Sequence, residues 1–173
     1  MRIIGIDPGL RFTGFACVNV IDPQRGSEAP GVGLELVDAG VIRLRPGDSV
    51  ARRLVELDDD LAPLLHRLAP SRAAVEKLYA HYKHPATAAI MGHARGVMLL
   101  AIARAGIDLV ELGATEVKKS LTGHGHASKQ QIQRAVAAQL GLASLPEPPD
   151  VADAIAIALC AARRLGREEP VGS

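Results

Sequence analysis

The sequence is poor in aromatic residues and in cysteine. Its 173 residues include no tryptophan, two tyrosines, two phenylalanines and two cysteines. Cys17 falls in a predicted strand and Cys160 in a predicted apolar helix, and no spacing pattern supports a disulfide between them. We therefore expect two buried, reduced thiols, because free cysteines behave as small apolar side chains. A reducing, cytoplasmic compartment is the corresponding expectation.

The chain also lacks an excess of charge of one sign and any long hydrophobic run. It has 20 Lys and Arg against 19 Asp and Glu, so no global basic field indicates nucleic acid. Uninterrupted apolar runs, such as 97–103, are too short to cross a bilayer. The chain opens directly into a predicted strand. We therefore expect neither a membrane span nor a secretory signal.

The composition suits one folded domain. Apolar residues make up 48% of the chain and charged residues 23%, which is enough for a packed core and excludes disorder by composition. From the length we predict a single domain over residues 1–165. The remaining residues, 166–173, are predicted to form a flexible tail.

The N-terminal segment combines a short apolar strand with an acidic residue at its end. Residues 3–6 are mostly β-branched and apolar, which predicts a strand buried on both faces. The strand stops at Asp7, Pro8 and Gly9 predict a turn, and residues 12–20 predict a second strand that completes a hairpin. Asp7 either caps the turn through backbone N–H groups or holds a metal ion, because a buried carboxylate needs compensation.

A second acid follows a second short apolar strand. Residues 73–75 predict a strand, and Glu76 stands where that strand should end, as Asp7 does in the first. Neighbouring strand ends bring their side chains together at one edge of a sheet, so we expect the two carboxylates to meet. Elsewhere the spacing of apolar residues predicts strands over 34–44 and 107–112 and helices over 50–68 and 85–105.

Two more acids stand at the start of the last predicted helix. Asp150 begins this helix and Asp153 follows one turn later, so the two share a helix face. Asp150 could be a plain N-cap. Two acids side by side on a mostly apolar helix, however, repel each other and are poorly solvated. A bound divalent cation would explain the arrangement.

Basic and aromatic residues gather in two segments. Tyr79 and Tyr82 lie in the segment 77–84 among Lys83, a second lysine and two histidines. Such interleaving suits stacking on nucleobases with contacts to phosphate, and an ordinary polar loop with half-buried tyrosines is the alternative. No Asp or Glu occurs over residues 117–146, which contain Lys118, Lys119, Lys129 and Arg134. A basic face of this kind is typical of a DNA or RNA binder.

Taken together, the acids predict a metal-dependent phosphoryl-transfer site. The residues concerned are Asp7, Glu76, Asp150 and Asp153. Ligands that are all oxygen suit Mg²⁺ or Mn²⁺. Two such ions about 4 Å apart would activate a water and stabilise charge on the leaving oxygen. The basic and aromatic segments would supply the nucleic acid.

Five motifs follow one another along nearly the whole chain. They lie at residues 5–9 with Thr13 and Gly14, at 75–79, at 92–97, at 117–129 and at 150–157. In this order the sequence resembles the RuvC-type Holliday-junction resolvases of the ribonuclease H-like superfamily. The resemblance implies an α/β, ribonuclease H-like fold, with a five-stranded mixed sheet flanked by helices.

The resemblance also implies an activity and partners. A resolvase of this type is a homodimer that cleaves four-way DNA junctions with two Mg²⁺ per subunit, for which Mn²⁺ can substitute. Each subunit nicks one of two strands of like polarity, leaving 5′-phosphate and 3′-hydroxyl ends. The family works beside a junction-binding and branch-migration motor complex.

Carried over residue by residue, the resemblance assigns roles. The catalytic, metal-holding acids map onto Asp7, Glu76, Asp150 and Asp153. Tyr79 matches the aromatic residue that opens or stacks on junction bases, and Lys118 and Lys129 match the basic residues near the scissile phosphate. Lys83 and Lys119, in the same basic segments, are expected to contact DNA too. The dimer helix maps onto residues 86–105, and the loop 21–33 is longer than the family leads us to expect.

Three other readings stay open at this point. An ATP-binding fold of the sugar-kinase and actin type also carries Asp-x-Gly after a strand, but it needs two such domains, which this length does not allow. A shorter RNA-processing nuclease of the same fold fits less well with the Tyr79 loop and the segment from Lys118 to Lys129. A junction-binding dimer without catalysis is disfavoured by the presence of all four acids.

Overall fold

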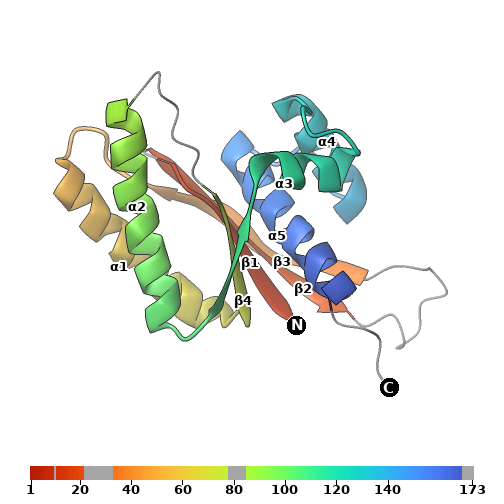
Figure 1. Ribbon diagram of the computed structural model, residues 1–173, viewed down its shortest axis with the longest axis horizontal. Coiled ribbons are helices and arrows are strands. Elements are labelled where there is room, and N and C mark those ends of the chain that lie inside the picture. The colour runs from red at the N-terminus through yellow and green to blue at the C-terminus, as the bar shows by residue number, and fades with distance from the viewer. Residues whose placement is uncertain (10, 22–32, 78–84, 169–173) are drawn as a thin grey trace.

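A five-stranded sheet forms the centre of the structure, which is a computed structural model that describes residues 1–9, 11–21, 33–77 and 85–168. The strand order is β3-β2-β1-β4-β5 (Figure 1). The strands are β1 (Arg2–Asp7), β2 (Phe12–Ile21), β3 (Gly33–Arg43), β4 (Arg72–Glu76) and β5 (Asp108–Leu112). The helices are α1 (Val50–Leu68), α2 (Pro85–Arg104), α3 (Ala114–Thr122), α4 (Lys129–Leu140) and α5 (Pro149–Glu168).

The sheet is mixed, as predicted. Strands β1, β2 and β3 pair antiparallel, so the expected hairpin is present, and β4 and β5 add in parallel beside β1. The helix expected over 50–68 is α1, with the same bounds, and the other predicted elements agree with the structure within about two residues. The α/β fold with a five-stranded mixed sheet is therefore confirmed. Helix α5 continues to Glu168, past residue 165 at which we expected the domain to end.

Helices cover both faces of the sheet and create two hydrophobic cores. Helices α1 and α2 lie on one face, and α3, α4 and α5 lie on the other (Figure 1). The first strand feeds both cores, because Ile3 packs with α5 while Ile4 and Ile6 pack with α1 and α2. A strand buried on both faces reads as continuously apolar, which is the pattern of residues 3–6.

Two glycines let α5 lie directly against the strands that it crosses. A Cβ atom on Gly5 in β1 would collide with the backbone of Ala154 and Ala158 in α5. A Cβ atom on Gly14 in β2 would collide with the carbonyl group of Asp150. Side chains at these two strand positions would push the helix away, so the glycines set the height of α5 above the sheet.

The two cysteines lie in different cores and are free. Cys17 packs with α1 and α2, whereas Cys160 packs with the residues around α5 on the opposite face of the sheet. Both thiols are buried and unpaired. The expectation of buried reduced thiols is confirmed, and burial raises the pKa of each thiol.

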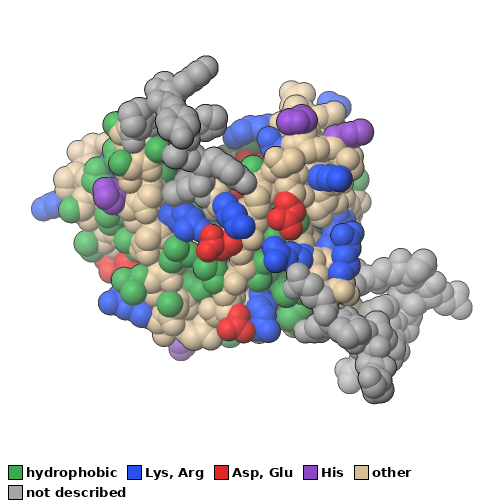
Figure 2. All heavy atoms as spheres, viewed as in Figure 1, with side chains coloured by type: hydrophobic (Ala, Val, Ile, Leu, Met, Phe, Trp, Pro, Cys, Tyr) green, Lys and Arg blue, Asp and Glu red, His purple; other side chains and the backbone are tan. Residues whose placement is uncertain are grey.

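Helix α2 is apolar but poorly covered. It is the one helix of the described residues that is long and apolar enough to cross a membrane by length and composition, and 22% of that window is buried. We expected no membrane span because the uninterrupted apolar runs are short, and in this helix they are broken by Gly92, His93, Arg95 and Gly96. Leu100 is 47% exposed, and Gly92 and Gly96 have open space beside them. Apolar side chains reach the surface along α2 (Figure 2).

Candidate active site

The four predicted acids are carried to the same end of the sheet by three elements. Asp7 ends β1 and Glu76 ends β4, and these strands pair in parallel with Ile6 opposite Val75. The next residues of the two strands are therefore neighbours at one sheet edge. Helix α5 begins over this edge, since the Asp150 carbonyl lies against Gly14, the partner of Asp7 in the hairpin.

The carboxylates lie close enough together to raise one another's pKa values. The pKa of Asp7 is raised from 3.8 to about 8, chiefly by burial and then by the charges of Asp153, Glu76 and Asp150. Burial, followed by the charge of Asp153, also raises the pKa of Glu76. Burial raises the pKa of Asp153 as well. The site thus gathers more negative charge than its own surroundings neutralise.

Two of the predicted lysines face these acids. The Lys129 Nζ lies 3.6 Å from the Asp153 Oδ2, and its charge lowers the pKa of Asp153 against the effect of burial. The Lys118 ammonium lowers the pKa of Glu76 and of Asp153. Both lysines therefore lie beside the carboxylates.

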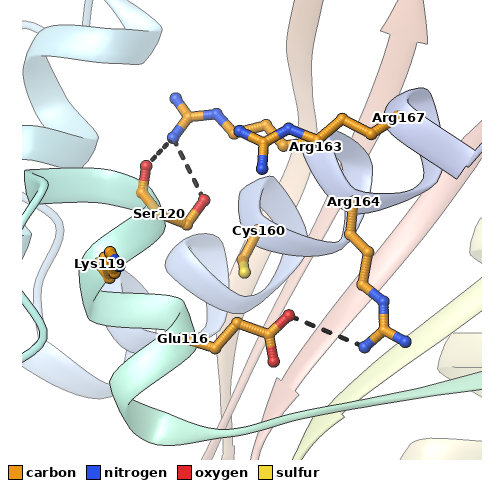
Figure 3. A pocket seen from close by; sticks show the side chains of 7 residues that line it. All are labelled: Glu116, Lys119, Ser120, Cys160, Arg163, Arg164 and Arg167. Carbon is orange, nitrogen blue, oxygen red and sulfur yellow. Dashed lines mark hydrogen bonds and ion pairs between the residues drawn. The ribbon is translucent and has the colours of Figure 1, made fainter.

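Of the other predicted DNA contacts, only Lys119 lies within the described residues, and it does not join this group. Lys119 lines a different pocket, between α3 and α5 (Figure 3). Tyr79 and Lys83 lie outside the described residues, so their roles stay predictions. The same holds for most of the loop 21–33.

Local capping places Lys129 at the first position of α4. The Ser128 side chain accepts a hydrogen bond from the Gln131 backbone N–H, and the Gln131 side chain accepts one from the Ser128 N–H. This capping box satisfies two N–H groups that the helix start would leave open. The Gln133 side chain donates to the Pro146 carbonyl and so ties α4 to the segment before α5.

Arg95 is a residue of this region to which sequence reasoning gave no role. Its Nε donates to the Glu76 carbonyl at 3.4 Å, and its Nη2 lies 2.6 Å from the Glu111 Oε2. The side chain is 14% exposed. The signal was present in the sequence, because Arg95 is the only Lys, Arg, Asp or Glu from residue 85 to residue 103. A lone arginine in an apolar helix needs a partner.

The chemistry of the donor set fits a hard divalent cation. All four acids offer carboxylate oxygens, which Mg²⁺ and Mn²⁺ prefer, and a cation would offset the burial and the neighbouring charges that raise the pKa of Asp7. Among the described residues, no three His, Cys, Asp or Glu side chains are arranged as a finished metal cage. The ends of β1 and β4 and the start of α5 place the carboxylates together, and the side chains would have to come closer to one another to hold an ion.

Nearly the whole chain matches one family of known proteins. A family model described as "Crossover junction endodeoxyribonuclease RuvC" matches residues 3–161. A protein of that name from Rhodopirellula baltica is 47% identical over 158 residues, which cover 91% of this chain and 84% of that protein. Another from Acidiphilium cryptum is 46% identical over 164 residues, covering 95% and 92%.

Solved structures agree with the sequence comparisons. The Thermus thermophilus RuvC structure superposes with a TM-score of 0.81 at 34% identity, covering 96% of this chain and 97% of that one. The structure of T. thermophilus RuvC in complex with a Holliday junction substrate gives a TM-score of 0.82 at 32% identity, with 96% of both chains covered. The chain therefore belongs to the RuvC family of crossover junction endodeoxyribonucleases.

Proposed function

We propose that this protein is a structure-selective endonuclease that resolves four-way (Holliday) DNA junctions in recombination and repair. The observation that carries the proposal is the meeting of four carboxylates from β1, β4 and α5 at one sheet edge, with the pKa of Asp7 raised to about 8. The likeness to a RuvC solved with a Holliday junction supports the choice of substrate.

The acids would hold divalent cations, Mg²⁺ by preference and Mn²⁺ as a substitute, with two ions per subunit. When bound, such ions make water a better nucleophile at neutral pH and offset charge on the phosphoryl and leaving oxygens. Asp7, Glu76, Asp150 and Asp153 would be the protein ligands. Asp7 has to give up its proton to bind, and the positive charge of a cation favours that loss.

The lysines at the site would position the Asp153 carboxylate and attract the scissile phosphate. Lys129 holds the Asp153 carboxylate in position through their 3.6 Å ion pair, and Lys118 lies close enough to influence both Glu76 and Asp153. Their positive charges attract the phosphate backbone to the edge where the acids stand. Cleavage would leave a 5′-phosphate and a 3′-hydroxyl, which a ligase can join.

We also propose that the chain acts as a homodimer through α2. This helix is apolar, but only 22% of its apolar stretch is buried within the subunit, and Leu100 is 47% exposed. The open space beside Gly92 and Gly96 would allow a second helix to approach closely. Two subunits related by a twofold axis present two equivalent sites, as two symmetric nicks in strands of like polarity require.

The proposal extends to the cellular setting. A junction resolvase would work in the cytoplasm beside a complex that binds junctions and drives branch migration. Both free thiols are compatible with a reducing compartment.

The proposed activity is tested with a synthetic mobile four-way junction and a linear duplex of the same sequence, each in Mg²⁺ and in EDTA. We expect paired, symmetric, ligatable nicks in the junction alone, absent in EDTA. The variant Asp7→Asn should bind the junction nearly as well as the wild type but not cleave it. Binding without nicks in either Mg²⁺ or Mn²⁺ would contradict catalysis, and cleavage of RNA or linear duplex would contradict the junction as substrate.

A further inference from the structure

A second basic site lies between α3 and α5, apart from the four acids. It is a pocket of about 460 Å³ (Figure 3). Its lining comes from α3 through Glu116, Lys119 and Ser120, and from α5 through Cys160, Arg163, Arg164 and Arg167. Figure 2 shows basic side chains gathered on this face, over α3 and the C-terminal part of α5.

The pocket has an unusual charge balance for this chain. Four basic residues and one acidic residue line it, whereas the whole sequence has 20 basic and 19 acidic residues. The acid, Glu116, pairs with Arg164 at 3.8 Å. Among the described residues, neither Lys119 nor Arg167 has a carboxylate within ion-pair distance. Among the described residues, the side chains that line the pocket therefore carry a net positive charge.

Neutral groups hold one of the guanidinium groups in place. Arg163 donates to the Ser120 carbonyl and lies 2.8 Å from the Gln139 Oε1. Hydrogen bonds to neutral oxygens orient an arginine without removing its charge. In Figure 3 the Arg167 side chain extends over Cys160, between the guanidinium groups of Arg163 and Arg164. The four basic side chains thus line one pocket, with Arg163 and Arg164 on opposite sides of Arg167.

The position of this pocket relative to the acids follows from α5 itself. Cys160, Arg163, Arg164 and Arg167 are spaced by three and four residues, so they share one face of the helix. The acid Asp153 lies on the same helix, ten residues before Arg163, which is about 15 Å at 1.5 Å per residue. One turn of duplex DNA spans about 34 Å, so one arm of a junction is long enough to reach both places.

We propose that this pocket binds a backbone phosphate of a junction arm, outside the site of cleavage. The inference rests on the proposed function. The planar fork of arginine matches the oxygens of a phosphate, and several cations around one cavity suit a polyanion. Attraction of cations to a helix C-terminus explains basic residues at the end of α5. It does not explain why Lys119 of α3 faces the same cavity.

The test compares two variants that remove one positive charge each. Arg167→Gln changes the pocket, and Arg52→Gln changes an exposed arginine of α1 on the opposite face of the sheet. Junction affinity is measured by fluorescence anisotropy in EDTA at several salt concentrations. Each phosphate contact adds about 0.9 to the slope of log K against log salt. We expect Arg167→Gln to reduce the magnitude of this negative slope by about one and Arg52→Gln to leave the slope unchanged.

A neutral-phosphate scan then locates the contact. Junctions with a single methylphosphonate at successive positions of one arm are bound to the wild type and to Arg167→Gln. We expect one position, about 15–20 Å from the cut site, where neutralising the phosphate weakens the wild type but not the variant. No such position, together with equal slopes for Arg167→Gln and wild type, would overturn the proposal.

Two further measurements separate the alternatives. If inorganic phosphate binds the wild type but not Arg167→Gln while the junction slopes stay equal, the pocket takes a free anion and the DNA contact is wrong. Wild-type binding and cleavage of the junction are recorded with the same preparations. Their absence would refute the proposed function itself, whereas intact wild-type activity with unchanged slopes would refute only the pocket.

Discussion

The Arg95 guanidinium of α2 lies 2.6 Å from the Glu111 carboxylate of β5, across the end of the sheet. The same side chain donates to the carbonyl of Glu76, the residue that ends β4. Helix α2 is also the proposed dimer helix. Arg95 therefore connects the surface that would meet a second subunit with the strand end that presents one of the four acids.

Replacing Arg95 with glutamine should loosen the end of β4. Hydrogen bonds to charged groups contribute about 1.5–3 kcal/mol, and the exposure of Glu111 places this pair at the lower end of that range. We expect Arg95→Gln to lower the free energy of unfolding by about 1–2 kcal/mol. Cleavage should fall more than junction binding, since Glu76 is displaced and the basic residues are not. Urea unfolding and single-turnover cleavage measure the two effects.

The control for this variant is Arg104→Gln, which removes an exposed charge from the same helix. It should change neither stability nor the cleavage rate appreciably. Because Arg95 acts through Glu76, Arg95→Gln should also need more Mg²⁺ for half-maximal cleavage. An unchanged Mg²⁺ requirement would mean that Arg95 supports the fold alone.

Without divalent cations the protein should become less stable as pH rises. Burial and the neighbouring acids raise the pKa of Asp7 from 3.8 to about 8. Between pH 3.8 and about pH 8, Asp7 is therefore protonated in the folded state and ionised in the unfolded state. Stability falls with pH wherever the folded state binds more protons, by at most about 1.4 kcal/mol per pH unit for one group. Urea unfolding in EDTA at several pH values should show this decline, and Asp7→Asn should flatten it.

Adding Mg²⁺ should oppose the decline. A cation binds the ionised carboxylates of the folded state, so its stabilising effect should be larger at pH 8 than at pH 5. The same unfolding series with and without Mg²⁺ gives the comparison. A stability that rises with pH in EDTA would contradict the mutual repulsion of the acids.

Lys129 should contribute to catalysis more than to folding. Its side chain is 74% exposed, and exposed ion pairs contribute about 0–1 kcal/mol, so Lys129→Ala should unfold much like the wild type. Cleavage should drop about tenfold, corresponding to about 1.4 kcal/mol, because the Asp153 carboxylate loses its partner and the phosphate loses a cation. The salt slope of junction binding should fall by about one. Lys129→Arg, which keeps the charge, should retain the slope, and an unaltered slope in Lys129→Ala would remove Lys129 from the DNA contact.

Gly5 should tolerate no side chain. Its added Cβ would meet the backbone of Ala154 and Ala158, and overpacking of this kind typically costs about 1–3 kcal/mol. Because α5 carries two of the acids, Gly5→Ala should lower cleavage as well as the melting temperature. Gly47→Ala is the matched control, since nothing lies within 4 Å of its added Cβ. Equal melting temperatures for the two variants would show that α5 does not depend on the close approach at Gly5.

Much of the fold was readable from local sequence because its signals are local. The continuous apolar run before Asp7 indicates a strand with a core on each side, and both cores are present. The leucines of 50–68 lie at helical spacing and lead to α1 with the same bounds.

Local sequence did not reveal the relations between residues far apart in the chain. That Lys118 faces the acids while Lys119 faces another pocket depends on how α3 rotates against α5, and a run of lysines carries no such information. The partners of Arg95 are likewise 16 and 19 residues away, on two strands that only the sheet order makes neighbours.

The sequence by itself determined the residue types of the site and the elements that carry them: acids after two apolar strands and at the start of one helix. The tertiary structure decided which charges share one environment. The parallel pairing of β1 with β4 and the close packing of α5 on Gly5 and Gly14 bring Asp7 beside three other carboxylates. Burial and repulsion depend on distances between elements, and a pKa of about 8 for Asp7 arises only after the chain has folded.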